Sequence, residues 1–116
     1  MNLQTVTVYA KDWKVTRRFY TEVLGLTIEH EQDEHFAIFA TGPTKLCVDP
    51  LHGPTKEPTS AQLIFDVTEF GSYLERARAA GYKTDGPRLL PGGKTEVLDI
   101  DDPDARDVRL ARSTAR

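Results

Sequence analysis

The pattern that most constrains the fold of this chain is a tandem repeat of predicted elements. A strand, a helix and three strands follow one another in residues 1–50, and the same order returns in residues 61–112. Val6–Trp13 aligns with Leu63–Phe70, which gives a period of about 57 residues. Each half can build one sheet whose apolar face is covered by one helix. The sequence therefore predicts an α+β fold of two tandem βαβββ modules, with curved sheets around a groove and the helices on the outer face.

The first half shows the expected start and stop signals. Alternating apolar and polar residues predict a strand over residues 3–10. Asp12 is a suitable helix N-cap, apolar residues recur at helical spacing from Trp13 to Leu24, and Gly25 ends the helix. Turn-forming residues separate three further strands, which are expected at residues 26–31, 35–40 and 45–50.

The second half repeats this order after a linker. Gly53, Pro54 and Pro58 indicate a linker over residues 51–60. A strand follows at 62–67, and then a helix that begins at Thr68 or Glu69 and ends at Gly81. The last strands are expected at 83–88, 95–100 and 107–111. We expect a single domain over 1–116, divided into module one at 1–50, the linker at 51–60 and module two at 61–112.

Composition and charge exclude several classes of protein. Hydrophobic residues make up 39% of the chain and charged residues 28%, as in ordinary globular domains. The net charge of -3 without a basic stripe argues against a nucleic-acid partner. No apolar run approaches the roughly 20 residues of a membrane helix, and the first residues do not resemble a secretion signal. With a single cysteine, Cys47, these features predict a cytoplasmic protein without membrane attachment.

Several motifs together carry a family resemblance. In the first module they are Val8–Asp12, Arg18–Tyr20 and Leu24–Leu26, and in the second Phe65–Val67, Ala79–Gly81 and Asp102–Asp104. These motifs resemble the vicinal-oxygen-chelate superfamily, which includes glyoxalase I, extradiol dioxygenases, fosfomycin-modifying enzymes and non-catalytic proteins that sequester bleomycin and related antibiotics. The resemblance covers nearly the whole chain. It implies the fold rather than one activity, because this fold serves many functions.

The resemblance also implies where a metal ion would be bound. The matching positions are Thr5, Cys47, Gln62 and Arg109, and only Gln62 is a residue type that the family uses as a ligand. A guanidinium has no lone pair to offer a metal. A divalent ion about 4 Å from Arg109 would be repelled by roughly 8 kcal/mol at an effective dielectric constant near 20. We therefore expect neither a metal nor another cofactor.

The remaining residues of ligand or nucleophile type favour structural roles. His30 and His35 flank a predicted hairpin, and His52 lies in the linker, so all three are expected to be solvated turn residues. Cys47 could ligate a soft metal or act as a nucleophile, but a lone strand cysteine is more often a small buried hydrophobe. No catalytic residue is assigned.

One turn departs from the family pattern. Ala105 and Arg106 follow Asp102-Pro103-Asp104, where the family has Gly-Asn. A left-handed backbone position would be strained at Ala105, so we expect either strain or a different turn.

Strand alternation predicts which residues face the groove. The expected ligand-binding residues are Thr5, Thr7, Tyr9, Phe39, Cys47, Asp49, Gln62, Ile64, Asp99 and Arg109, and Asp66, Val97 and Asp107 share their face. Aromatic surface, hydroxyls and carboxylates suit a small amphipathic molecule with hydrogen-bonding or cationic groups. The alternative is that Asp49, Asp66, Asp99 and Arg109 pair with one another on a solvated sheet face.

Two features leave alternatives open. Trp13 belongs either to the core or to the rim of a neighbouring subunit's groove. The loop Pro87–Gly93 combines leucines with glycines, which fits a lid or a dimer contact. The resemblance to antibiotic-sequestering proteins, which form swapped dimers, implies a homodimer.

The preferred hypothesis is a metal-free small-molecule binding protein, for example one that sequesters an antibiotic. The alternative is a lyase, isomerase or dioxygenase that depends on a divalent metal, with Gln62 and then Asp99, Asp107 or Cys47 as displaced ligands. A third hypothesis is a regulatory module whose groove is filled by a partner segment.

Overall fold

The computed structural model describes residues 1–51, 57–58 and 60–114. The chain divides into two compact units, Met1–Ser60 and Ala61–Arg116. Each unit contains a four-stranded mixed sheet and helical structure, so the predicted α+β fold of two βαβββ modules is confirmed. Most of the predicted linker, including His52, Gly53 and Pro54, lies outside the described residues. Within the described residues, no helix is long and apolar enough to cross a membrane.

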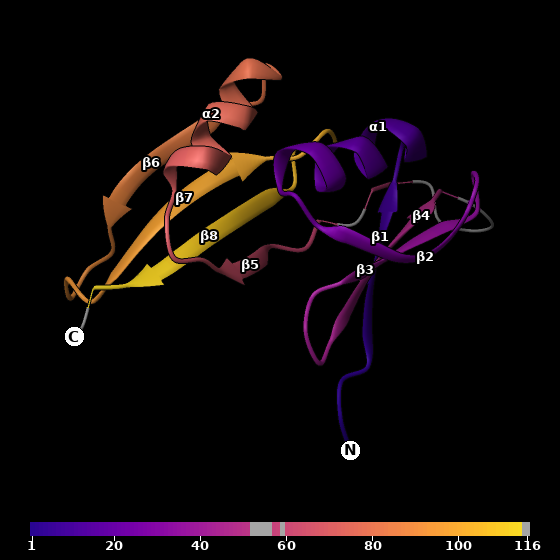
Figure 1. Cartoon of the computed structure of the whole chain (residues 1–116), viewed down its shortest axis with the longest axis horizontal. Helices are drawn as coiled ribbons and strands as arrows, with labels where there is room; N and C mark the ends of the chain where they lie inside the picture. The colour runs from indigo at the N-terminus through magenta and orange to yellow at the C-terminus, as the bar shows by residue number, and fades with distance from the viewer. Residues whose placement is uncertain (52–56, 59, 115–116) are drawn as a thin grey trace. The chain divides into compact units, whose positions relative to one another are not determined.

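The first unit contains a sheet of four strands in the order β1-β4-β3-β2 (Figure 1). Its elements are β1 (Thr5–Ala10), α1 (Trp13–Arg18), the π-helix η1 (Phe19–Val23), β2 (Thr27–Gln32), β3 (Phe36–Ala40) and β4 (Lys45–Pro50). Asp12 caps α1 as predicted, because its carboxylate accepts a hydrogen bond from the backbone N–H of Val15 at 3.3 Å. Sequence analysis predicted one helix, whereas the structure changes to a π-helix at Phe19 and ends before Gly25, whose φ is +72°.

The core of the first unit lies between its helical segment and one face of its sheet. Phe19 and Tyr20 are fully buried, and their rings meet edge to face at 5.0 Å. Trp13 is 3% exposed and donates from Nε1 to the carbonyl of Val48 at 3.0 Å. Of the two alternatives for Trp13, the structure shows the core position.

The second unit repeats this order, with a sheet in the order β5-β8-β7-β6 (Figure 1). Its elements are β5 (Leu63–Asp66), α2 (Gly71–Ala79), β6 (Thr84–Leu89), β7 (Thr95–Asp101) and β8 (Asp107–Ser113). The helix begins two residues after Glu69, whose carboxylate accepts hydrogen bonds from the backbone N–H and hydroxyl of Ser72. Leu98, Ile100, Val108 and Leu110 form the buried face of the sheet.

The turn between β7 and β8 keeps a left-handed residue although no glycine is present. Ala105 has a φ of +61°. The Asp102 carboxylate accepts the backbone N–H groups of Asp104 and Arg106 at 2.9 Å each and pairs with the Arg106 guanidinium. Both of these charged side chains are buried. The turn is thus held by side-chain bonds that the dipeptide Ala105-Arg106 did not reveal in the sequence.

Candidate functional site

Most of the predicted site residues of the first unit lie on the face of its sheet that the helical segment does not cover. Strand register pairs Thr7 with Cys47 and Tyr9 with Asp49, and paired residues point to the same side of a sheet. Val6 and Val8 alternate with them and pair with the buried Leu46 and Val48. Thr5 is exposed and Thr7, Tyr9 and Asp49 are half-buried. Threonine, tyrosine, cysteine and aspartate side chains therefore share one surface of the first sheet.

Phe39 lies on the opposite face, so its predicted position is wrong. It pairs with Leu46 in the sheet, is fully buried and packs 6.0 Å from the Tyr20 ring. Ile38, which pairs with Cys47, takes the place on the uncovered face. Phe39 thus belongs to the core beneath the helical segment.

Cys47 is a protonated thiol that is 7% exposed. Its Sγ donates to the Asp49 carboxylate at 3.0 Å. Burial raises the pKa of the thiol to about 12, and the hydrogen bond to Asp49 and its negative charge act in the same direction. Because the thiolate is the attacking species, a thiol with so high a pKa lacks the environment of a nucleophile.

The second group of predicted residues lies on the uncovered face of the second sheet. Ile64, Arg109 and Asp99 are neighbours across β5, β8 and β7. The Ile64 side chain is 60% exposed, and Asp66 is also exposed. Gln62, just before β5, donates its amide to Asp107 on β8. Val97 shares this face and is fully buried.

Arg109 is held by Asp99 in a bidentate ion pair. Its Nε and Nη2 donate to the two carboxylate oxygens at 2.8 and 3.2 Å, and Arg88 Nη1 donates to the same carboxylate at 3.0 Å. Burial alone would raise the pKa of Asp99, but the bonds from Arg109 and Arg88 outweigh it and lower that pKa below its usual value. The bond to Asp99 raises the pKa of Arg109, and the negative charge of Asp107 raises it further. Both shifts favour the charged forms of Asp99 and Arg109.

The side chains at the four positions implied for a metal do not suit one. Cys47 is buried and its thiol is bonded to Asp49, the Gln62 amide is bonded to Asp107, and Arg109 is a cation without a lone pair. Thr5 offers only a neutral hydroxyl. His35 is an exposed turn residue as expected, whereas His30 is exposed but lies within β2, where it pairs with Ile38, so its expected turn position is wrong. Among the described residues, no three His, Cys, Asp or Glu side chains gather in a way that could hold a metal ion.

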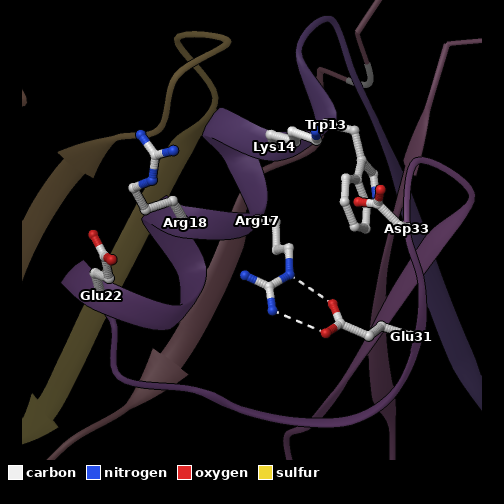
Figure 2. A pocket seen from close by; sticks show the side chains of 7 residues that line it. All are labelled: Trp13, Lys14, Arg17, Arg18, Glu22, Glu31 and Asp33. Atoms are coloured by element: carbon white, nitrogen blue, oxygen red, sulfur yellow. Dashed lines mark hydrogen bonds and ion pairs between the residues drawn. The ribbon is translucent and has the colours of Figure 1, made fainter.

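A pocket of about 490 Å³ lies elsewhere, between the outer face of the helical segment and strand β2 of the first unit (Figure 2). Its lining residues are Trp13, Lys14, Arg17, Arg18, Glu22, Glu31 and Asp33. Arg17 spans it and binds Glu31 through Nε and Nη2 at 2.6 and 2.9 Å. The sequence analysis did not include these residues among the expected ligand-binding residues. The basic residues at helical spacing were visible in the sequence, but their acidic partners on the following hairpin were not.

The fold defines the class of protein: it consists of two βαβββ modules, each with polar residues on the sheet face opposite its helix. The family model for the Glyoxalase/Bleomycin resistance protein/Dioxygenase superfamily matches residues 2–107. The chain belongs to this superfamily.

Solved structures with the same fold differ in what their names describe. The antibiotic binding protein TnmS3 from Streptomyces sp. CB03234 is 22% identical, with a TM-score of 0.81 over 98% of this chain and 97% of that one. A lactoylglutathione lyase from Agrobacterium tumefaciens is 17% identical, with a TM-score of 0.74 over 96% and 92% of the two chains. No functionally curated protein matches the sequence. At these identities the similarity shows the fold alone.

Proposed function

We propose that this protein binds a small amphipathic molecule on its uncovered sheet faces without a metal ion. The observation that carries the proposal is the ion pair between Arg109 and Asp99 at a position where the resemblance implies a metal-ligating carboxylate. A guanidinium that is already bound by two oxygens cannot become a metal ligand. The proposal includes the features that the sequence implied, namely one domain, a homodimer and a cytoplasmic location.

The residues on these faces indicate the character of the ligand. Ile64 offers exposed apolar surface, and Asp66 beside it on β5 carries a negative charge. On the first sheet, Thr7 and Tyr9 supply hydroxyls next to Asp49. Apolar surface with a few placed polar groups is typical of small-molecule sites. An amphipathic compound with a cationic group fits, and antibiotic sequestration is one function of this kind.

The alternative activity, that of a metal-dependent lyase, isomerase or dioxygenase, needs two or three converging His or carboxylate ligands. Of the proposed displaced ligands, Asp99 is bound by two arginines, and Cys47 is buried with its thiol bonded to Asp49. We therefore rank metal-free binding above it.

Thermal unfolding tests the proposal. Chelator-treated protein is heated with a panel of cationic, neutral and anionic amphipathic antibiotics. A ligand at 100 times its dissociation constant adds about 2.7 kcal/mol, which corresponds to a rise in Tm of several degrees. Ile64→Ser should abolish the rise, whereas Leu3→Ser, at a similarly exposed residue before β1, should preserve it. No rise with any compound, or a rise only after a divalent metal is added, would contradict the proposal.

A further inference from the structure

Arg109, Asp99, Asp107 and Gln62 form a cluster in which oxygen-bearing side chains of the kind that bind cations lie near a guanidinium cation. Arg109 faces Asp99 across the sheet, and Asp107 lies two residues before it on the same face of β8. The charge of Asp107 acts on the Arg109 guanidinium, and the Gln62 amide donates to Asp107. Carboxylates and amide carbonyls are hard oxygen ligands of the kind that Mg²⁺, Ca²⁺ or Mn²⁺ prefer. Here one carboxylate binds a guanidinium and the charge of the other acts on it.

The carboxylates of this cluster depend on that guanidinium for compensation. Oδ1 of Asp107 is buried and accepts no hydrogen bond from any residue of the described ranges. Asp101 pairs directly with Asp107 across β7 and β8, and like charges in such positions are destabilising. Arg88 also donates to Asp99, but it lies on β6, on the opposite side of β7 from Arg109. Without Arg109, the carboxylates of Asp99 and Asp107 would lose the cation that β8 supplies, and uncompensated carboxylates are the ligands that hard divalent ions prefer.

We propose that Arg109 is a built-in cation that takes the place of the metal ion and keeps divalent metals out of this sheet face. This inference rests on the proposed metal-free function and names the residue responsible for it. A side-chain cation cannot dissociate or be removed by chelators, and a guanidinium stays charged at any physiological pH. The site would therefore be indifferent to metals as long as the guanidinium is present, and its carboxylates would become a metal site once it is lost.

The test measures Mn²⁺ binding to the full chain by electron paramagnetic resonance of the free ion. Wild type should take up no Mn²⁺ at this site. Arg109→Gln, which removes the charge, should bind Mn²⁺ about tenfold more tightly than wild type or better. Arg109→Lys, which keeps the charge, should behave as wild type. Adding Asp99→Asn to Arg109→Gln should abolish the new binding, and adding Asp33→Asn, on the first unit, should leave it intact.

The outcomes separate this inference from the proposed function. If Arg109→Gln binds no more Mn²⁺ than wild type, the guanidinium does not exclude the metal and the inference fails, while metal-free ligand binding stands. If wild type itself binds Mn²⁺ and Asp99→Asn removes it, both fail. Should Arg109→Gln be unfolded in metal-free buffer, Mn²⁺ must refold it, because the ion would neutralise the same carboxylates. A variant that stays unfolded in millimolar Mn²⁺ overturns the inference.

Discussion

At the scale of single residues, charge compensation decides the chemistry of the uncovered faces. The Asp99 carboxylate receives three N–H groups from Arg109 and Arg88 and is mostly buried. On the other sheet, burial raises the pKa of the Cys47 thiol, and the Asp49 carboxylate, which accepts from that thiol, raises it further. The effects of both carboxylates can be measured in solution.

Cys47 should react slowly with iodoacetamide in the native protein. With a pKa of about 12, the thiolate fraction at pH 8 is on the order of a thousandfold below that of an ordinary thiol with a pKa of about 8.5. Alkylation followed by mass spectrometry in native buffer and in denaturant measures the ratio. Asp49→Asn should speed the native reaction, because it removes two of the causes that raise the pKa. Native labelling as fast as that of the denatured chain would show that the thiol is not protected.

Asp99 should make stability fall at acid pH. Its pKa is lower in the folded than in the unfolded state, so its ionised form favours folding. That contribution is complete above the unfolded pKa of about 3.9 and is lost as the pH falls through the folded pKa. Asp99→Asn should lower the free energy of unfolding by about 1–2 kcal/mol at pH 7 and by progressively less below pH 4, as measured by urea unfolding. Asp85→Asn, at the more exposed partner of Arg88, is the control. An equal cost for Asp99→Asn at all pH values would refute the assignment.

At the scale of elements, strand register decides which side chains belong to the core. β3 contains Phe36, Ala37, Ile38, Phe39 and Ala40, so both of its faces are apolar. Alternation within such a strand cannot tell the covered face from the uncovered one. The pairing of Phe39 with Leu46 and its packing on Tyr20 settle the question.

Truncating the two neighbouring residues of β3 should therefore have unequal effects. Phe39→Ala removes a fully buried ring and should destabilise the protein by about 3–5 kcal/mol. Ile38→Ala, at a half-buried position, should cost no more than about 2 kcal/mol. Urea unfolding of both variants measures the difference. A larger cost at Ile38 would place the core on the other face.

Gly86 is required by the irregular pairing of β6 with β7. Its φ is +111°, and an added Cβ would lie 2.9 Å from the carbonyl oxygen of Val97 and 3.2 Å from the N of Arg88. Gly92→Ala is a matched control, since φ there is +99° with no atom within 4 Å of the added Cβ. We expect Gly92→Ala to cost about 1–2 kcal/mol for its backbone conformation and Gly86→Ala about 1–3 kcal/mol more. Similar melting temperatures for the two variants would show that the contact with Val97 relaxes freely.

At the scale of the whole molecule, one repeated design yields two units with different chemistry. The first sheet presents hydroxyls and a thiol, and the second presents an ion-pair cluster and exposed Ile64. The repeat sets the strand order of each unit, β1-β4-β3-β2 and β5-β8-β7-β6. Among the residues that the structure describes, the helical segment of each unit covers one face of its sheet, and the polar residues discussed above lie on the other.

The chain should form a homodimer in solution. Leu89, at the end of β6, is 58% exposed in the segment for which a lid and a dimer contact are the alternatives. Light scattering after gel filtration should give about twice the 13.0 kDa mass of one chain. Leu89→Asp should shift the protein toward the monomer if this segment is the contact, whereas an unchanged dimer would favour the lid. A monomeric wild type would contradict the expected assembly.

The sequence alone determined the order of the elements, because hydrophobic periodicity and turn residues act locally. Asp12 and Gly25 mark the first helical segment in the sequence as they do in the structure, and the strands lie within a few residues of their expected bounds. The alternation of polar residues also placed Thr7, Cys47, Asp99 and Arg109 on their observed faces.

Only the tertiary structure decided which distant residues meet. The bonds of Arg109 to Asp99 and of Arg17 to Glu31 depend on strand register and on packing between elements, which no local pattern encodes. For the same reason, the face of Phe39 and the change to a π-helix at Phe19 became visible only after the core was assembled. Local periodicity sets which elements form, whereas long-range contacts set which charges neutralise one another, and the chemistry of the candidate site depends on the latter.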